Sequence, residues 1–380
     1  MDSIKSLDVF FNKKKVGTLA EIDRYASAFE YDSNWLSNGF SISPLSLPLE
    51  KKLFIPKPDP FGGLYGVFAD SLPDGWGRLL VDRLMLSQRI DPNTVNSLTR
   101  LAIVGASGMG ALSYQPEISL AEDSMNLDYD EIALECARLL ETEYSDDLDE
   151  LFHLGGSSGG ARPKILTKID GEEWIIKFPS TQDKLDIGQQ EYLYSLCAKA
   201  CGLEMTETRL FPSKVGPGYF GTKRFDRIST QDNIALKKHM LSVSALLETS
   251  HRTPNLDYDI LMRLTRILTN DIFELKKLYR IMCFNVFAHN RDDHSKNFSF
   301  IYDENAEKWS LAPAYDLTHS YSIGGEHATT INGNGKDPSI EDILAIAKKH
   351  GLPNKFAIET AHSIEEKVHE MLGTFLKKNL

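Results

Sequence analysis

The segment His289-Asn-Arg-Asp-Asp-His-Ser-Lys-Asn297, followed at a distance by Tyr315-Asp316, decides how this chain folds and what chemistry it can carry out. It places a carboxylate at Asp292, an amide five positions later at Asn297, and a second carboxylate at Asp316 after an apolar strand pattern. In protein kinases an Asp orients the attacking hydroxyl, and an Asn five positions later binds magnesium. Asp, Asn and His are also common in turns, so the segment alone also fits a solvated loop.

A glycine-rich segment, Leu154-Gly-Gly-Ser-Ser-Gly-Gly-Ala-Arg-Pro-Lys164, lies upstream. Its glycines allow positive φ and let backbone N–H groups approach an anion, although it contains neither a Walker motif nor a Gly-x-Gly-x-x-Gly run. A Gly-Ser composition also fits a flexible linker. Strand patterns follow at 165–169 and 173–179, separated by a turn at Asp170-Gly171. This layout predicts a nucleotide-binding hairpin in which Lys177 contacts the α- and β-phosphates.

A helical pattern follows the hairpin, beginning at Glu191 and ending at Gly202, which suits a helix C-terminus. Glu191 is then the counterpart of the helix glutamate that pairs with the strand lysine in kinases, and a solvent-facing glutamate is the alternative. The strand Gly221-Thr-Lys-Arg-Phe-Asp-Arg227 leads out of this lobe. Its backbone is placed to meet the edge of an adenine ring.

Taken in order, these segments resemble the HipA-type serine/threonine kinases, the toxins of bacterial type II toxin–antitoxin systems. The motifs are Gly-Gly-Ser-Ser-Gly-Gly-Ala-Arg-Pro-Lys, Trp-Ile-Ile-Lys, Glu-Tyr with its helix, Lys-Arg-Phe-Asp-Arg, Asn-Arg-Asp-Asp-His-Ser-Lys-Asn-Phe-Ser and Ala-Tyr-Asp-Leu. Residues 68–77 are also similar to that family's N-terminal region, so the resemblance covers essentially the whole chain. It implies an α+β, protein-kinase-like two-lobed fold, with an α/β nucleotide lobe, an extra N-terminal subdomain, and an all-helical C-terminal lobe.

The resemblance also implies roles for individual residues. Asp292 would be the catalytic base, Asn297 and Asp316 the Mg²⁺ ligands, and Lys177 the phosphate contact, held by Glu191. Further ATP-binding positions that it implies are Gly159, Gly160, Ala161, Arg162, Pro163 and Lys164 in the nucleotide loop, Lys223, Arg224 and Phe225 on the adenine side, and His294, Ser295, Lys296 and Tyr315 around the catalytic loop.

Members of this family phosphorylate a serine in their own glycine-rich loop, which ejects the loop and silences the kinase. Aligning on Lys164 puts Ser157 in that role, with Ser158 as the neighbouring alternative. A phosphate there would add a charge of roughly −1.5 to −2 where ATP phosphates must sit, so loop closure would be opposed. The chain has Tyr315-Asp316-Leu317 in place of Asp-Phe-Gly. The stretch 318–330 fits either an activation segment or a surface loop.

The expected function is an ATP- and Mg²⁺-dependent serine/threonine protein kinase that acts as the toxin of a toxin–antitoxin pair. Family members act on aminoacyl-tRNA synthetases, so the resemblance implies a substrate of that class. It also implies a small helix-turn-helix, HipB-like antitoxin through which operator DNA is contacted. Two alternatives remain: a small-molecule kinase, which shares the catalytic Asp and Asn, and a non-catalytic, ATP-binding corepressor of an antitoxin. The presence of Lys177, Asp292, Asn297 and Asp316 together argues against the corepressor.

Composition limits the remaining possibilities. The chain has 54 acidic and 42 basic residues and a formal net charge of −12, which argues against unaided DNA binding because phosphate neutralisation supplies most non-specific affinity. No run of about 18 apolar residues is present, and the N-terminus lacks the apolar core of a secretory signal, so a cytoplasmic protein with no membrane contact is expected. The four cysteines show no Cys-x-x-Cys spacing and are interpreted as small buried side chains.

Three zones are expected along the chain: an N-terminal α/β subdomain at 1–115, a nucleotide-binding lobe at 116–240, and a helical catalytic lobe at 241–380. Helices are predicted at 77–85, 130–140, 339–351 and 354–377, and a solvated acidic connector at 143–150. Apolar residues at helical spacing predict a further helix just before the catalytic loop. These residues are Ile272, Leu275, Tyr279, Met282 and Val286.

Overall fold

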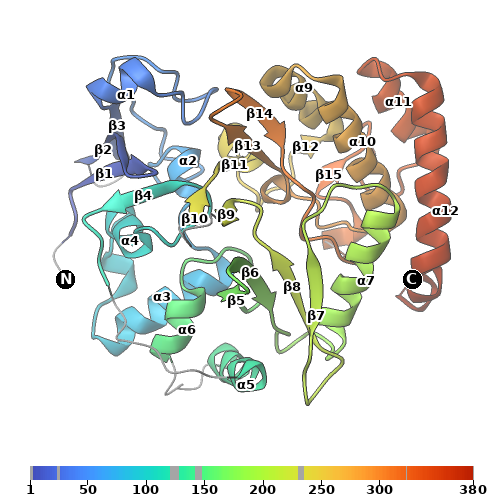
Figure 1. Ribbon diagram of the computed structural model, residues 1–380, viewed down its shortest axis with the longest axis horizontal. Helices are drawn as coiled ribbons and strands as arrows, with labels where there is room; N and C mark the ends of the chain where they lie inside the picture. The colour runs from blue at the N-terminus through green and yellow to red at the C-terminus, as the bar shows by residue number, and fades with distance from the viewer. Residues whose placement is uncertain are drawn as a thin grey trace. The chain divides into compact units, whose positions relative to one another are not determined.

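The computed structural model describes residues 3–23, 26–119, 128–141, 148–229, 235–321 and 323–379, with its helices and strands labelled in Figure 1. The chain divides into two compact units that do not follow a single cut in the sequence. Unit 1 comprises residues 1–188, 210–241 and 245–249, and unit 2 comprises residues 189–209, 242–244 and 250–380. The chain therefore passes between the units several times before its last segment.

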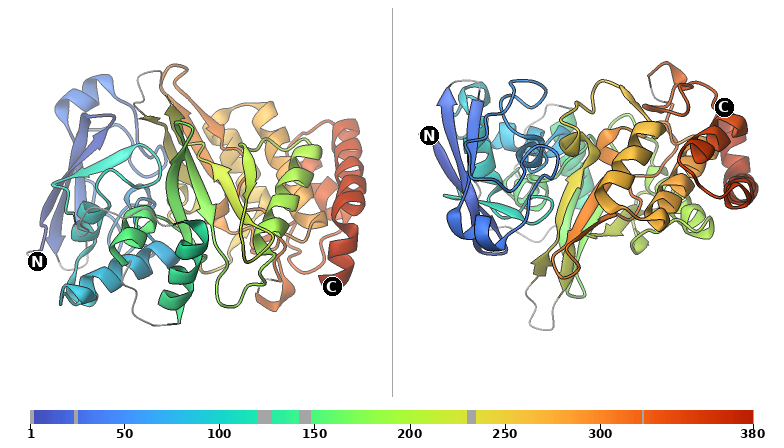
Figure 2. Two further views of the ribbon diagram at one scale, coloured as in Figure 1. Left: turned by 60° about the horizontal axis from the view of Figure 1, so that its bottom comes forward. Right: turned by 90° about the horizontal axis from the view of Figure 1, so that it is seen from above.

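Unit 1 opens with a four-stranded antiparallel sheet in the order β3-β2-β1-β4. Asn12 and Lys13 form the turn between the first two strands, both with positive φ, as a tight two-residue turn requires. Helix α4 packs on this sheet, which Figure 2 shows from two sides. The elements are β1 (Ser6–Phe11), β2 (Lys14–Asp23), β3 (Ala26–Tyr31), α1 (Ser33–Asn38), α2 (Gly66–Ala69), α3 (Gly75–Ser87), α4 (Ser97–Val104) and β4 (Leu112–Gln115).

A second sheet has the order β5-β6-β8-β7. Asp170 and Gly171 join β5 to β6 with positive φ, so the predicted hairpin is confirmed. The antiparallel register pairs Lys177 with Lys164 on one side and with Phe220 on the other. The strands are β5 (Lys164–Ile169), β6 (Glu172–Lys177), β7 (Thr208–Phe211) and β8 (Tyr219–Lys223), and β9 (Arg227–Ser229), β10 (Ala235–Lys237) and β11 (His239–Ser242) follow them in the chain.

One apolar core joins α3 to the second sheet within unit 1. It also includes α5 (Tyr129–Leu140) and α6 (Leu148–Gly155), and its buried side chains include Trp76, Ile176 and Phe178. Each such side chain contributes about 1.5–3 kcal/mol when it is fully buried. The stretches 1–115 and 116–240, expected as separate zones, therefore contribute to a shared core.

The connector predicted at 143–150 needs a correction in the part that the structure describes. Residues 142–147 lie outside the described residues, and Leu148 begins α6, with Asp149 and Glu150 in its first turn. Acidic side chains stabilise a helix N-terminus through the helix dipole. The acids here therefore start a helix that extends as far as Gly155, into the segment predicted as a glycine-rich loop.

Unit 2 is mainly helical, and α11 and α12 lie side by side at the end of the chain (Figures 1 and 2). It also contains an antiparallel hairpin of β13 and β14, so the lobe expected to be all-helical is not purely so. The hairpin buries Phe300 and Leu311 while the chain reverses between the catalytic segment and Tyr315. The elements are α7 (Ile187–Ala200), α8 (Val243–Leu246), β12 (Leu256–Asp257), α9 (Tyr258–Thr269), α10 (Ile272–Phe287), β13 (Ser299–Asp303), β14 (Lys308–Leu311), β15 (Thr329–Thr330), α11 (Ile340–Lys349) and α12 (Asn354–Asn379).

Several local predictions for unit 2 are confirmed. Ser339 and Asp342 form a capping box at the start of α11, and Gly202 follows α7 with positive φ. Helix α7 begins at Ile187, earlier than the expected start at Glu191. The four cysteines are free and buried. Within the described ranges, no helix is both long and apolar enough to cross a membrane.

Candidate active site

The catalytic segment is held at the end of α10. Asp271 caps the start of α10, and after Ala288 the residue His289 takes positive φ and ends the helical path. The side-chain Nδ2 of Asn297 then donates to the carbonyl oxygen of Asp292 at 2.8 Å, which closes the loop between them. The Asp292 side chain is 58% exposed, and its Oδ1 lies 3.9 Å from Nε2 of His294. An exposed carboxylate on a closed loop can meet an incoming hydroxyl.

The residues between Asp292 and Asn297 support this loop. Nδ1 of His294 accepts the backbone N–H of Lys296 at 3.2 Å and so caps a short 3₁₀ turn from Ser295 to Asn297. Ser295 is buried, and its hydroxyl has no hydrogen-bond partner among the described residues. Among the expected ATP-binding residues of this stretch, His294 and Lys296 are half-buried.

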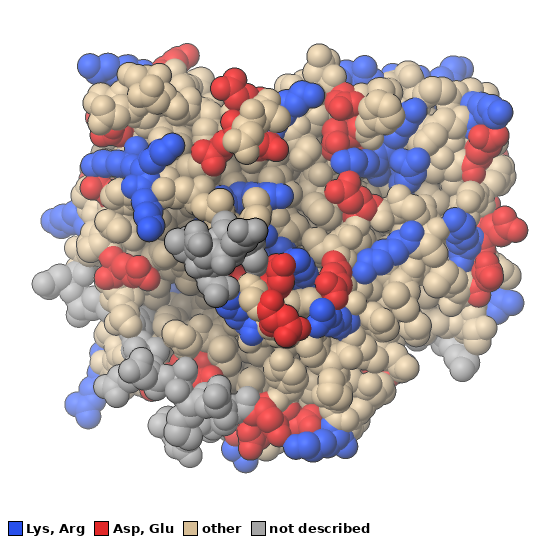
Figure 3. All heavy atoms as spheres, in the orientation of Figure 1, with Lys and Arg blue, Asp and Glu red and all other residues tan. Residues whose placement is uncertain are grey.

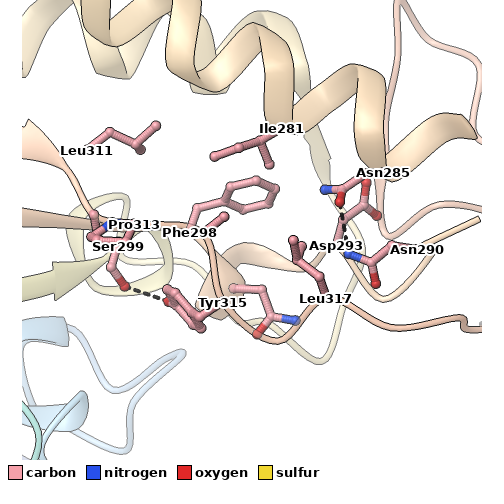
Figure 4. A pocket seen from close by; sticks show the side chains of 13 residues that line it. Ile281, Asn285, Asn290, Asp293, Phe298, Ser299, Leu311, Pro313, Tyr315 and Leu317 are labelled. Carbon is pink, nitrogen blue, oxygen red and sulfur yellow. Dashed lines mark hydrogen bonds between the residues drawn. The ribbon is translucent and has the colours of Figure 1, made fainter. Parts of the chain in front are cut away.

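The segment after the β13–β14 hairpin brings Tyr315 and Asp316 to the catalytic loop. The Tyr315 hydroxyl lies 2.6 Å from the carbonyl oxygen of Lys296 and 2.6 Å from Oγ of Ser299, and Figure 4 shows the contact with Ser299. Tyr315 and Asn297 line the same pocket of unit 2. Asp316, the next residue, has φ of 56°. These contacts hold Tyr315, the residue before Asp316, against the segment from Lys296 to Ser299.

The donor set of this site fits magnesium. Asn297 and Asp316 offer an amide and a carboxylate oxygen, the ligand types that Mg²⁺ prefers, and Mg²⁺ keeps several waters in such sites. No group of three or more His, Cys, Asp or Glu side chains suited to a metal occurs among the residues that the structure describes. A site with two protein ligands plus phosphate oxygens does not require such a group.

In unit 1, Lys177 ends strand β6 and is largely buried, with 9% of its surface exposed. Its Nζ lies 5.6 Å from the centre of the Phe220 ring, a cation–π distance. Glu191 is also buried and lies on α7 in unit 2. The structure describes the two residues in different units, so their pairing stays a prediction.

The glycine-rich loop of unit 1 is bound to the start of α3. The carboxylate of Asp74 accepts the N–H of Gly160, and the carbonyl oxygen of Gly160 accepts the N–H of Trp76 at 2.9 Å. Nζ of Lys164 donates to the carbonyl oxygen of Gly159 at 2.6 Å. Asp74 occupies the N-cap position of α3 without capping its own helix. Its carboxylate instead holds the loop.

The end of the loop is also held in place. Arg162 makes a two-point ion pair with Asp183, at 3.0 and 3.2 Å, a strong geometry for a guanidinium and a carboxylate. Pro163 is buried, and its carbonyl oxygen accepts the N–H of Phe178 at 2.8 Å. Ala161 is exposed. The loop therefore has one exposed turn between two anchored ends.

The two candidate phosphoserines differ in exposure. Ser158 is 2% exposed, and its hydroxyl donates to the carbonyl oxygen of Gly155 at 2.6 Å. Ser157 is half-buried, and its hydroxyl makes a longer bond, 3.2 Å, to the carbonyl oxygen of Ser107. Ser157 is thus the more accessible hydroxyl.

The three residues expected on the adenine side, Lys223, Arg224 and Phe225, differ in burial and in their partners. Nζ of Lys223 lies 2.9 Å from Oε1 of Glu172, and Phe225 is half-buried. Arg224 is 4% exposed, and its guanidinium binds the fully buried carboxylate of Asp226 at 2.7 and 2.9 Å. The Arg224 side chain is therefore part of an internal ion network.

That network joins β8 and β9 to the loop before β4. Arg227 also binds Asp226, and the two arginines donate to the carbonyl oxygen of Gly108. Burial alone would raise the pKa of Asp226, but Arg224 and Arg227 lower it to about 2. No role was predicted for Asp74 and Asp293, whose partners are distant in the chain. The same holds for Asp226, which has neighbouring arginine partners but also accepts the N–H of Gly110, 116 residues away. The only local signal was the turn sequence Pro73-Asp74-Gly75 before a helix pattern.

The fold and the geometry of the catalytic segment define a protein-kinase-like protein with an α/β nucleotide lobe. The HipA-like C-terminal domain model matches residues 156–372, and the HipA N-terminal domain model matches residues 7–115. The chain belongs to the HipA family. The resemblance noted from its motifs is confirmed.

Three further proteins are similar to this chain to different extents. The putative kinase Y4mE of Sinorhizobium fredii is 26% identical over 355 residues, which are 83% of this chain and 77% of that protein. A HipA chain of Shewanella oneidensis MR-1, solved with HipB and its operator DNA, has the same fold, with a TM-score of 0.71 and 17% identity over 97% of this chain and 90% of that one. The Helicobacter pylori proinflammatory kinase CtkA aligns over 55% of this chain and 90% of its own, at a TM-score of 0.36 and 12% identity.

Proposed function

We propose that this protein is an ATP-dependent serine/threonine protein kinase and the toxin of a toxin–antitoxin pair. The observation that supports the proposal is a HipA-family chain in which Asn297 bonds to Asp292 and Tyr315, which precedes Asp316, bonds to Lys296. The curated relative described as a putative kinase supports phosphoryl transfer. The HipA chain solved with HipB and operator DNA supports a toxin–antitoxin context.

In the proposed mechanism, Asp292 accepts a hydrogen bond from the substrate hydroxyl and aims its oxygen at the γ-phosphate. Asn297 and Asp316 hold Mg²⁺, which, when bound, neutralises charge on the phosphate oxygens. Lys177 and the N–H groups of the glycine-rich loop position the phosphates. The protein supplies little covalent chemistry, so the rate gain comes from alignment and charge stabilisation.

The proposal extends to partners. A helix-turn-helix antitoxin would bind this chain and carry most of the DNA contact, because the chain itself has a net charge of −12. The protein substrate would be a translation component such as an aminoacyl-tRNA synthetase, met in the cytoplasm. Autophosphorylation of the glycine-rich loop would switch the kinase off, since a phosphate there opposes closure over ATP.

The direct test is intact-mass measurement and phosphopeptide mapping after incubation with Mg-ATP, with Asp292→Ala as the matched inactive variant. We expect the wild type to gain phosphate on the glycine-rich loop and Asp292→Ala to gain none. A wild type that binds no ATP would contradict the kinase and favour a non-catalytic corepressor. Transfer to small alcohols but to no protein would instead indicate a small-molecule kinase.

A further inference from the structure

Asp293, the neighbour of the proposed catalytic Asp292, lies at the centre of a buried network inside unit 2. One of its carboxylate oxygens, Oδ2, lies 3.0 Å from Nδ1 of His327 and accepts the Tyr258 hydroxyl at 3.2 Å. The other oxygen accepts the backbone N–H of Thr329 at 3.1 Å. Both Asp293 and His327 are almost fully buried. Nδ1 of His327 lies within hydrogen-bond distance of this carboxylate.

The network continues into the core helices. The Tyr258 hydroxyl, at the start of α9, accepts Nδ2 of Asn285 at 2.8 Å, and Oδ1 of Asn285 accepts Nδ2 of Asn290 at 2.9 Å. Asn285 lies on α10, and Figure 4 shows its bond to Asn290 beside Asp293. A buried and connected polar network is costly to disturb, because each group left unpaired loses solvation without compensation. Asp293 is therefore anchored to two helices.

The backbone around Asp293 also holds the segment that follows Asp316. At its near end this segment donates from the N–H of Ser320 to the carbonyl oxygen of His289 at 3.1 Å. At its far end the Thr329 hydroxyl donates to the carbonyl oxygen of Asp293 at 2.5 Å, and β15 pairs in parallel with β12. The stretch that could have been a loose surface loop is hydrogen-bonded to the catalytic loop at both ends.

We propose that Asp293, paired with His327, is a positioning residue for phosphoryl transfer. Asp292 precedes Asp293 directly, and Asp293 holds the far end of the segment that begins at Asp316, through His327 and Thr329. The pair thus sets the spacing between the carboxylate that orients the acceptor and the carboxylate that holds Mg²⁺. This inference rests on the proposed function. Because a misplacement of about 1 Å can cost about 100-fold in rate, loss of the pair lowers kcat more than it changes substrate affinity.

The kinetic test uses Asp293→Asn, His327→Gln and the double variant. We expect each single variant to lower kcat by about 10- to 100-fold while KM for ATP changes little. The double variant should lose no more than the worse single one, because both changes remove one interaction. The control is His350→Gln, which breaks a similar pair with Asp259, 2.8 Å long and also in unit 2. It should lower Tm by a similar amount and leave kcat unchanged.

Hydrogen exchange gives a readout that needs no activity. In Asp293→Asn, amides of residues 290–297 and 317–329 should exchange faster than in the wild type, and in His350→Gln they should not. If the wild type transfers no phosphate, the proposed function is wrong. The exchange rates would still show whether Asp293 holds the two segments in place. Wild-type kcat in Asp293→Asn, equal loss of kcat in His350→Gln, or unchanged exchange in both segments would overturn the inference.

Discussion

Asp316 combines a proposed Mg²⁺ ligand with an unusual backbone conformation. Its φ of 56° lies in the left-handed region, which Asn and Asp tolerate better than other non-glycine residues. We therefore expect Asp316→Asn to fold normally and to lose the magnesium-dependent part of ATP binding, as measured by calorimetry with and without Mg²⁺. Asp316→Ala should lose the same binding and, in addition, about 1 kcal/mol of stability. Unchanged Mg-ATP affinity in Asp316→Asn would remove Asp316 from the metal site.

The two loop serines allow a matched comparison. Ser157 is the more accessible hydroxyl, whereas Ser158 is buried and bonded to Gly155. We expect Ser157→Ala to abolish loop autophosphorylation and Ser158→Ala to retain it, while costing about 1 kcal/mol for the lost buried hydrogen bond. Phosphopeptide mapping and thermal unfolding measure the two effects. Phosphate on Ser158 in the wild type would reverse the assignment.

His239 in unit 1 makes stability depend on pH. Burial lowers its pKa to about 4, although the contact of its Nε2 with the carbonyl oxygen of Ile42, at 2.7 Å, favours the charged form. In the unfolded chain the His239 imidazole takes up a proton near pH 6.5, whereas in the folded chain it does so only near pH 4. The stability that the neutral, buried His239 contributes is therefore present above pH 6.5 and is lost as pH falls toward 4. The loss is about 3 kcal/mol, because one unit of pKa shift corresponds to about 1.4 kcal/mol.

His239→Gln is the variant that tests this pH dependence, because glutamine can donate to the same carbonyl oxygen but does not titrate. We expect the unfolding free energy of the wild type to fall more steeply between pH 6.5 and pH 4 than that of His239→Gln, as measured by denaturant unfolding. Parallel profiles for the two proteins would show that His239 is not responsible.

Candidate residues in short segments could be singled out from the sequence, and their roles stay predictions. Asp292, Asn297 and Asp316 stand in short segments with a recognisable spacing, whereas the environment of a side chain depends on distant partners. His327 lies 34 residues from Asp293, and Gly160 lies 86 residues from Asp74. No pattern within a single segment indicates such pairs. Arg224 lies only two residues from Asp226, but its contact with the carbonyl oxygen of Gly108 spans 116 residues, so its burial was not foreseen.

At the scale of elements, the contact between α3 and the glycine-rich loop depends on two glycines. A Cβ at Gly75 would overlap the backbone of Gly160, and a Cβ at Gly77 would overlap the backbone of Ser158. The loop therefore lies directly against the first turn of α3. Asp74 adds its bond to the N–H of Gly160.

Gly77→Ala tests this contact. Alanine is the better helix former by about 1 kcal/mol, so a helix-only view predicts stabilisation. We expect Gly77→Ala instead to displace the loop, to increase protease cleavage at residues 156–163, and to weaken ATP binding by about 10-fold, roughly 1.4 kcal/mol. Gly373→Ala is the control, because that glycine is in helix α12 and a Cβ there would meet only ordinary contacts. Equal ATP affinity in both variants would refute the idea.

Helices were easier to predict than the elements that join them. The apolar spacing that ends at Val286 predicts α10 because one helix face is buried, and the capping residues of α11 are adjacent in sequence. Helix α6 was mistaken for a connector because its acidic first turn resembles a solvated charge run. The β13–β14 hairpin in a mainly helical unit was not predicted. It reverses the chain so that Tyr315 contacts Lys296, and this contact depends on tertiary structure.

At the scale of the whole molecule, the distribution of charge bears on whether the chain binds DNA by itself. On the face shown in Figure 3, basic and acidic side chains are interspersed, and the net charge is −12. Mixed charge gives little attraction for a polyanion. This pattern favours the proposal that an antitoxin supplies the contacts to DNA.

Nucleotide binding should stabilise the folded chain, because Lys177 is proposed to contact the phosphates of ATP and Asp316 to hold Mg²⁺. A ligand that binds only the folded state stabilises it by about 2.7 kcal/mol at 100 times its Kd. We expect a non-hydrolysable ATP analogue with Mg²⁺ to raise Tm by a few degrees, and EDTA to remove most of this shift. Asp316→Asn should lose the magnesium-dependent part of the shift, since its ligand oxygen is weaker, whereas Lys177→Met should lose the shift with or without metal. If millimolar Mg-nucleotide leaves the Tm of the wild type unchanged, ATP is excluded as the cofactor. A ligand that binds the folded state must raise Tm.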